Sequence, residues 1–140
     1  MATLANPTPV TWLGRPSALW TGRVLSGLVI AFLLLDSAMK LLALPIVGET
    51  MVALGWPGDA GTARLLGVLT LGSALLYAVP RTALLGAVVL TAYLGGAVAT
   101  HVRVGSPLFS HVLFGVYIGI AAWGGLWLRD PRLRAALRAE

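Results

Sequence analysis

The sequence predicts an all-α protein, an integral membrane bundle of four helices with both termini in the cytoplasm. The first observation is the charged fraction, which is 11% over 140 residues, whereas a soluble domain has about 25%. The second is the apolar fraction of 58%, with a mean hydropathy of +0.88. The third is a set of four apolar runs that approach the roughly 20 residues a helix needs to cross a bilayer. Lipid is therefore the expected environment.

Residues 1–23 are expected to form an interfacial leader, because they contain three prolines and no apolar run. A cleavable signal peptide is not expected, since the first span can direct its own insertion. The membrane domain is expected at 24–128 and a basic cytoplasmic tail at 129–140.

The expected spans are four apolar runs, and they cover 24–47, 65–79, 82–100 and 108–128. The last three hold no Asp, Glu, Lys or Arg. Backbone polar groups in hydrocarbon must bond to one another, so each run is expected to be a helix. Residues 50–54 of the first connection are candidates for a short interfacial helix, and GWPG follows as a turn signal. Pro80 and Arg81 alone connect the second and third spans, which must be antiparallel neighbours.

The arginines predict the orientation. An even number of spans places both termini on one side, and seven arginines lie in the segments of that side. The opposite side holds only Arg64 and Arg103. By the positive-inside rule the termini are cytoplasmic, and we expect a multi-pass protein of the bacterial cytoplasmic (inner) membrane.

Asp36 and Lys40 are the charged residues inside an expected span, where each costs about 2.5–3.5 kcal/mol on insertion scales. They are four residues apart with the acid first, the order that a helical ion pair prefers. Two interpretations remain open. The pair either fixes the register of the bundle, or it faces a polar cavity and handles a proton or a ligand group.

Other polar residues are expected at overlapping depths in the outer half of the bundle. A rise of about 1.5 Å per residue places Lys40 roughly 9–10 Å below the outer end of its span. His111 shares a helical stripe with Gly115 and Gly119, a spacing typical of close helix packing, so it is expected to point into the bundle. The candidate catalytic residues are Asp36, Lys40 and His111. The candidate ligand-binding residues are Tyr93, His101, Arg103 and, at the rim, Arg64.

Each of these residues also has a simpler interpretation. His101 and Arg103 stand where interfacial residues are often only solvated, and Tyr93 can serve a neighbouring helix as a hydrogen-bond partner. Two histidines with one carboxylate suit iron, but Asp36 is expected a full turn too deep. No metal or haem is therefore expected.

Several function classes are excluded by composition. The chain has no cysteine, so disulfides, thiolate nucleophiles and iron–sulfur ligation are ruled out. Its net charge of +5 comes from basic residues scattered between apolar runs, which do not form the patch that nucleic-acid binding needs.

Three segments carry a resemblance to a known family. They are DSAMKL in the first span, PRTALLGAVVLTAYLGGAVATHVRVGSPLF at 80–109, and the ending WGGLWLRDPRLR. Together they resemble the DoxX-like family of small bacterial membrane proteins over 23–134. The resemblance implies a four-helix membrane protein associated with redox or sulfur stress systems, since the family name comes from a subunit of a thiosulfate:quinone oxidoreductase. Many relatives carry a glutamate where this chain has Thr70 and Gly72, so an activity that depends on that acid is not expected here.

Three functions remain in competition. The first is a redox-associated protein that binds a quinone or similar hydrophobic small molecule in the outer half of the bundle, with electrons supplied by a partner subunit. The second is a lipid-phase isomerase, cyclase or epoxide hydrolase that uses Asp36 and His111 as general acid and base. The third is a non-catalytic membrane subunit whose glycine face meets a partner or a second copy. Whether the protein is an enzyme stays open.

Overall fold

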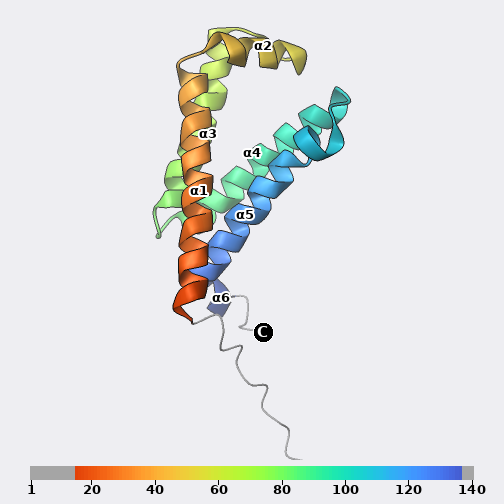
Figure 1. Ribbon diagram of the computed structural model, residues 1–140. Helices are drawn as coiled ribbons and strands as arrows, with labels where there is room; N and C mark the ends of the chain where they lie inside the picture. Colours follow the sequence, from red (N-terminus) through yellow and green to blue (C-terminus); the bar gives the residue numbers. More distant parts are fainter. Residues whose placement is uncertain (1–14, 137–140) are drawn as a thin grey trace, which may run out of the picture.

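The computed structural model describes residues 15–136, and these are built from helices without a strand (Figure 1). Four helical segments are long and apolar enough to cross a membrane. They are α1 (Pro16–Leu41), α3 (Ala60–Ala78), α4 (Ala83–Arg103), and the pair η2 (Leu108–Val112) and α5 (Phe114–Arg129). Two short helices, α2 (Pro45–Ala53) and α6 (Pro131–Ala136), complete the described chain. The predicted all-α membrane bundle is confirmed.

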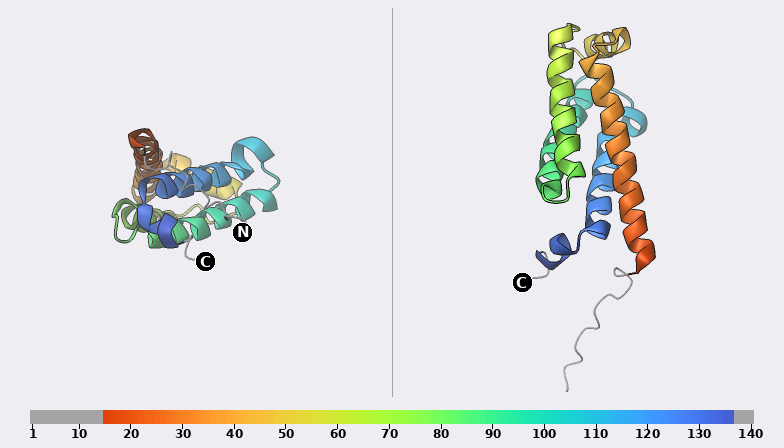
Figure 2. Two further views of the ribbon diagram at one scale, coloured as in Figure 1. Left: turned by 90° about the horizontal axis from the view of Figure 1, so that it is seen from below. Right: turned by 90° about the vertical axis from the view of Figure 1, so that its left-hand side faces the viewer.

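The helices follow the order α1, α3, α4, α5 around the bundle. Helix α1 packs against α3 and α5, and α4 packs against the same two helices. Consequently α1 lies diagonally opposite α4. The beginning of α1 and the helix α6 lie at the same end (Figures 1 and 2). From this lower end, α4 and α5 lean away from α1 and α3, so that the two pairs diverge toward α2 at the upper end (Figure 1).

Small residues close the lower end. A Cβ built on Gly125 of α5 would lie 2.7 Å from the Oγ of Ser26 of α1, and one on Gly22 would lie 2.9 Å from the carbonyl oxygen of Gly125. Hydrophobic burial does not drive helices together in lipid, so such close backbone approach has to come from small residues. The fully buried Tyr77 of α3 adds polar contacts, donating to the carbonyl of Ala122 at 2.6 Å and lying 3.0 Å from Ser26 Oγ.

The predicted glycine face is used inside the chain. Gly115 of α5 is buried, and a Cβ there would lie 3.0 Å from Val98 Cγ2 and 3.3 Å from the carbonyl oxygen of Leu94. Gly119 faces Leu94 as well, at 3.8 Å. Both glycines therefore pack against α4 of the same bundle.

The first span differs from its predicted bounds. Helix α1 begins at Pro16, inside the segment expected as a leader, and ends at Leu41 instead of residue 47. Ala43 has a φ of 50°, and Pro45 starts α2. Proline disfavours helical backbone in the residue before it, which explains why the apolar run is divided there. Residues 1–14 of the leader lie outside the described residues.

This break changes the expected depths. Lys40 lies in the last turn of α1, so its predicted position 9–10 Å below the outer end of its span is wrong. At about 1.5 Å per residue, Asp36 lies roughly 7–8 Å below the end of α1. The two residues are covered from above by α2 instead of by a longer α1.

Asp59 begins α3 as its N-cap. One carboxylate oxygen accepts from the Thr62 hydroxyl at 2.7 Å and the other from the Thr62 backbone N–H at 2.9 Å. These bonds stabilise the ionised form, and they hold the pKa of the Asp59 carboxyl below its ordinary value.

Candidate functional site

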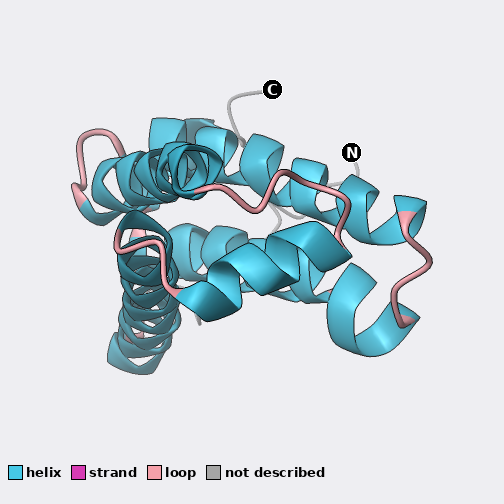
Figure 3. Cartoon of the chain, turned by 90° about the horizontal axis from the view of Figure 1, so that it is seen from above, coloured by secondary structure: helices cyan, strands magenta, loops and turns pink. Residues whose placement is uncertain are grey.

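A cavity of about 470 Å³ lies at the upper end of the bundle, where the helix pairs diverge. We call it the α2 cavity, because α2 and the loop that returns to α3 cross this end from above (Figure 3). Side chains of α1, α2, α3 and α4 line it, together with Leu54 and Trp56, which follow α2. Its polar lining residues are Asp36, Lys40, Thr50, Tyr93, Thr100 and His101.

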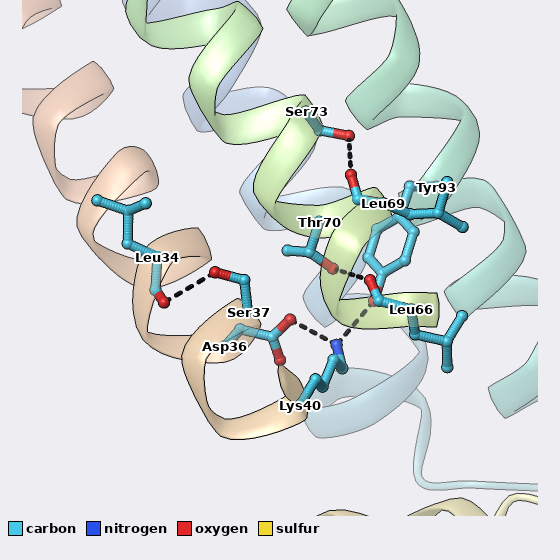
Figure 4. A network of polar contacts seen from close by, with 9 residues as sticks. All are labelled: Leu34, Asp36, Ser37, Lys40, Leu66, Leu69, Thr70, Ser73 and Tyr93. Carbon is cyan, nitrogen blue, oxygen red and sulfur yellow. Dashed lines mark hydrogen bonds and ion pairs between the residues drawn. The ribbon is translucent and has the colours of Figure 1, made fainter. Parts of the chain in front are cut away.

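Lys40 is the centre of the polar lining. Its Nζ donates to Asp36 Oδ2 within α1, and it also donates to the hydroxyl of Tyr93 on α4 at 2.7 Å (Figure 4). The same Nζ lies 5.3 Å from the centre of the Tyr93 ring. The predicted ion pair is present, and Lys40 connects it across the bundle to the diagonal helix. We call Asp36, Lys40 and Tyr93 the Lys40 triad.

Neighbouring residues position the end of α1. Gly67 of α3 is buried, and a Cβ there would lie 3.0 Å from Lys40 Cβ and 3.0 Å from the backbone nitrogen of Leu41. The absence of a side chain therefore lets α3 approach the helix end that carries Lys40. Arg64 donates from Nε to the carbonyl of Leu41 at 3.3 Å. A lysine in the last turn is also favoured by the negative end of the helix dipole.

Two buried hydroxyls of α3, which lie farther toward the lower end of the bundle than the Lys40 triad, bond to carbonyls of their own helix. Thr70 donates to the carbonyl of Leu66 at 2.9 Å, and Ser73 to that of Leu69 at 2.7 Å (Figure 4). Thr70 stands in the region where many relatives are expected to carry a glutamate, and it is fully buried. None of these hydroxyls lines the α2 cavity.

The two histidines meet, but only one of them lines the cavity. The rings of His101 and His111 pack edge to face with centroids 5.7 Å apart. His101 is half-buried and its Nδ1 lies 3.0 Å from Ser106 Oγ, whereas His111 is exposed and its Nδ1 lies 2.8 Å from Ser110 Oγ. The prediction that His111 points into the bundle with Gly115 is wrong. The chain is π-helical in η2 and turns at Leu113 before α5 begins, so a spacing of four residues does not keep one face there.

Arg103 contacts the backbone at the end of α2. Its Nη2 donates to the carbonyl of Leu54 at 2.7 Å, and a Cβ on Gly55 would lie 2.7 Å from the same nitrogen. Gly55 has a φ of 74°, which glycine adopts without strain. Arg103 therefore joins the end of α4 to the end of α2, outside the lining of the cavity.

Of the seven candidate residues, Asp36, Lys40, Tyr93 and His101 line one cavity, while Arg64, Arg103 and His111 lie around it. From the sequence, the segment with the candidate helix at 50–54 was expected to be a plain connection in preference to the cap of a pocket, but α2 supplies a wall of the cavity that includes Thr50 and Met51. Pro45 carried the signal, since a proline after an apolar run commonly starts a new helix. Within residues 15–136, no group of three or more His, Asp or Glu side chains lies close enough to hold a metal ion.

The site offers hydrogen-bond donors to a neutral acceptor. An ammonium has three N–H groups, and Lys40 uses two of them on Asp36 and Tyr93. Among the hydrogen bonds of residues 15–136 none uses the third N–H, which is therefore open to a ligand. Because Asp36 already balances the ammonium charge, a neutral carbonyl oxygen suits this position better than an anion does.

The chain is similar to a known protein family. The model of the DoxX-like family matches residues 24–125, a range that includes every residue lining the α2 cavity. No curated protein and no solved structure matches the chain.

Proposed function

Because the chain belongs to the DoxX-like family and is a multi-pass membrane protein, we propose that its α2 cavity binds a quinone-type molecule as part of a redox process. The observation that carries this proposal is the Lys40 triad, which places a paired ammonium against an otherwise largely apolar cavity of about 470 Å³. Small-molecule sites commonly have about 300–1,000 Å³, mostly apolar walls and a few placed polar groups.

The ligand carbonyl is held by Lys40 and Tyr93. The free N–H of Lys40 donates to the oxygen, and the Tyr93 hydroxyl, which accepts from Lys40, donates its own proton to the same atom. Met39 and Met51 contribute to the walls, and their unbranched side chains adapt to a flat ring. A quinone ring is neutral and carries carbonyl oxygens, which fits a site whose charges already balance.

Reduction of the bound quinone adds two electrons and two protons to form the quinol. In the proposed reaction Lys40 gives one proton to the oxygen held by the Lys40 triad and regains a proton from water, and the second proton reaches the other ligand oxygen from water. The electrons come from a reduced partner subunit or reductant. Asp36 stabilises the ammonium after the transfer, because it keeps the pair neutral when Lys40 regains a proton.

The acid–base alternative is less well supported. An isomerase, cyclase or epoxide hydrolase that used Asp36 and His111 on one substrate would need both side chains in the cavity, and His111 does not line it. The third alternative, a non-catalytic subunit that meets its partner through Gly115 and Gly119, is also less well supported, because both glycines pack against α4 of the same bundle.

Quinone binding can be followed by quenching of Trp56, the tryptophan that lines the cavity. With purified protein in nanodiscs, menadione should quench the native fluorescence and leave a Trp56→Phe variant largely unquenched. Lys40→Met should weaken binding about tenfold or more, the loss expected for a charged donor. Tyr93→Phe should weaken it less, and Tyr117→Phe on the exposed face of α5 serves as the matched control. Native protein that neither binds menadione nor retains a quinone through purification would refute the proposal.

We also propose that the lower end of the bundle faces the cytoplasm, with the α2 cavity in the outer half of the bacterial inner membrane. The arginine distribution supports this orientation. Since the chain has no cysteine, single cysteines report accessibility without background. Glu49→Cys on α2 should react with an impermeant thiol reagent in intact cells, and Arg81→Cys between α3 and α4 should react only after the membrane is permeabilised. The reverse pattern would overturn the orientation.

A further inference from the structure

The α2 cavity has helices on most of its sides. It lies between α1 and α4, which are diagonal to each other, with Leu66 of α3 on one flank and α2 above. The remaining flank lies between α1 and the segment formed by η2 and α5. Of the described residues, none from η2 or α5 lines the cavity.

The end of α2 is joined to the end of α4. Arg103 donates to the carbonyl of Leu54, and Leu54 itself lines the cavity. This contact connects the ends of the two helices, and Arg103 itself lies outside the lining of the cavity. The flank between α1 and η2 has no such connection among the described hydrogen bonds.

Two aromatic rings lie just below this flank. Phe32 of α1 and Phe114 at the start of α5 pack edge to face with centroids 5.4 Å apart. Phe32 is four residues before Asp36, so it occupies the same helix face one turn lower. The two rings are 36% and 43% exposed, so part of each ring is left uncovered on the outside of the bundle. Figure 1 shows that α1 and α5 diverge toward the upper end of the bundle.

We propose that the α2 cavity opens sideways into the bilayer between α1 and η2, and that its ligand carries a long apolar chain that lies over Phe32 and Phe114. This inference rests on the proposed function. The polar head binds at the Lys40 triad, and the chain leaves across the aromatic pair because this path keeps it out of water. The substrate class is thus a membrane-dissolved quinone with a hydrocarbon tail, which enters from the lipid.

The test compares two quinones with the same ring, menadione without a chain and phylloquinone with one. Native protein in nanodiscs should bind both. Phe32→Ala and Phe114→Ala should each weaken phylloquinone binding about tenfold, since the removed rings cover the chain, and should leave menadione affinity within about twofold. Phe109→Ala is the matched control, because Phe109 is 74% exposed and has no ring contact with Phe32. Unchanged menadione binding also shows that the variants fold.

The outcomes separate this inference from the function on which it rests. If native protein binds neither quinone, the proposed function fails. If menadione binds but the phenylalanine variants leave phylloquinone unaffected, or weaken both quinones equally, the lateral path is wrong while the quinone site stands.

Discussion

Lys40 and Tyr93 are hydrogen-bonded across the diagonal of the bundle, with 2.7 Å between the Nζ and the hydroxyl oxygen. Their helices, α1 and α4, do not pack against each other as neighbours. At the other end of the bundle, Tyr77 makes the comparable connection between α3 and α5 through the carbonyl of Ala122. Tyr77 is fully buried, whereas Tyr93 lines a cavity. One tyrosine thus closes the lower end, and the other leaves room for a ligand.

The Asp36–Lys40 pair should show coupling in stability. Either Asp36→Asn or Lys40→Met alone leaves one charge without its partner in a half-buried position, while the double variant removes both charges. We expect the double variant to be more stable than the sum of the single losses predicts, by about 1–3 kcal/mol, as for other residues in direct contact. Reversible unfolding in mixed detergent measures the cycle. Additive losses would mean that the ion pair contributes nothing to the fold.

Gly125 should tolerate no side chain. Gly125→Ala would place a Cβ 2.7 Å from Ser26 Oγ and 3.2 Å from the Gly22 carbonyl oxygen, so α1 and α5 must separate. The expected loss of stability is about 1–3 kcal/mol. Gly124→Ala is the matched control, because a Cβ there meets nothing within 4 Å, and alanine is favoured over glycine inside a helix by up to about 1 kcal/mol. Equal thermal stability of the two variants would contradict the close packing.

Part of the structure could be predicted from the amino-acid sequence. Four apolar runs predict the four spans because a backbone in hydrocarbon has no other way to satisfy its polar groups, and the spacing of Asp36 and Lys40 predicts their pairing. The predicted depth of Lys40 was wrong because hydropathy alone gives no sign of the helix break at Ala43, where the residues on both sides are apolar. The predicted orientation of His111 was wrong because residues four apart share a face only in a regular α-helix, and the chain is π-helical in η2. The contact of Arg103 with Leu54 joins residues far apart in the chain, and no local pattern indicates it.

Asp59 should make the start of α3 sensitive to acid. Its pKa lies below the ordinary value because the Thr62 hydroxyl and backbone N–H donate to the carboxylate. The folded chain therefore binds fewer protons there than the unfolded chain. The stabilisation is complete above the unfolded-state pKa near about 3.9 and is lost as the pH falls through the lower folded-state pKa. The difference in unfolding temperature between native protein and Asp59→Ala should shrink toward about pH 3. In Asp59→Ser, whose hydroxyl caps without titrating, the advantage over Asp59→Ala should not depend on pH.

Arg103 should control the mobility of α2. Arg103→Ala removes the bond to the Leu54 carbonyl, which leaves the end of α2 without its connection to α4. Amide hydrogen exchange over Pro45–Ala53 should become several-fold faster, because local opening follows the loss of such contacts. Quinone affinity should fall with it, since α2 supplies one wall of the cavity. Arg64→Ala removes a positive charge from the same end of the bundle but contacts Leu41 of α1, so it should leave exchange in α2 nearly unchanged. If both variants accelerate exchange in α2 to the same degree, the effect comes from lost charge, and Arg103 has no specific role in holding α2.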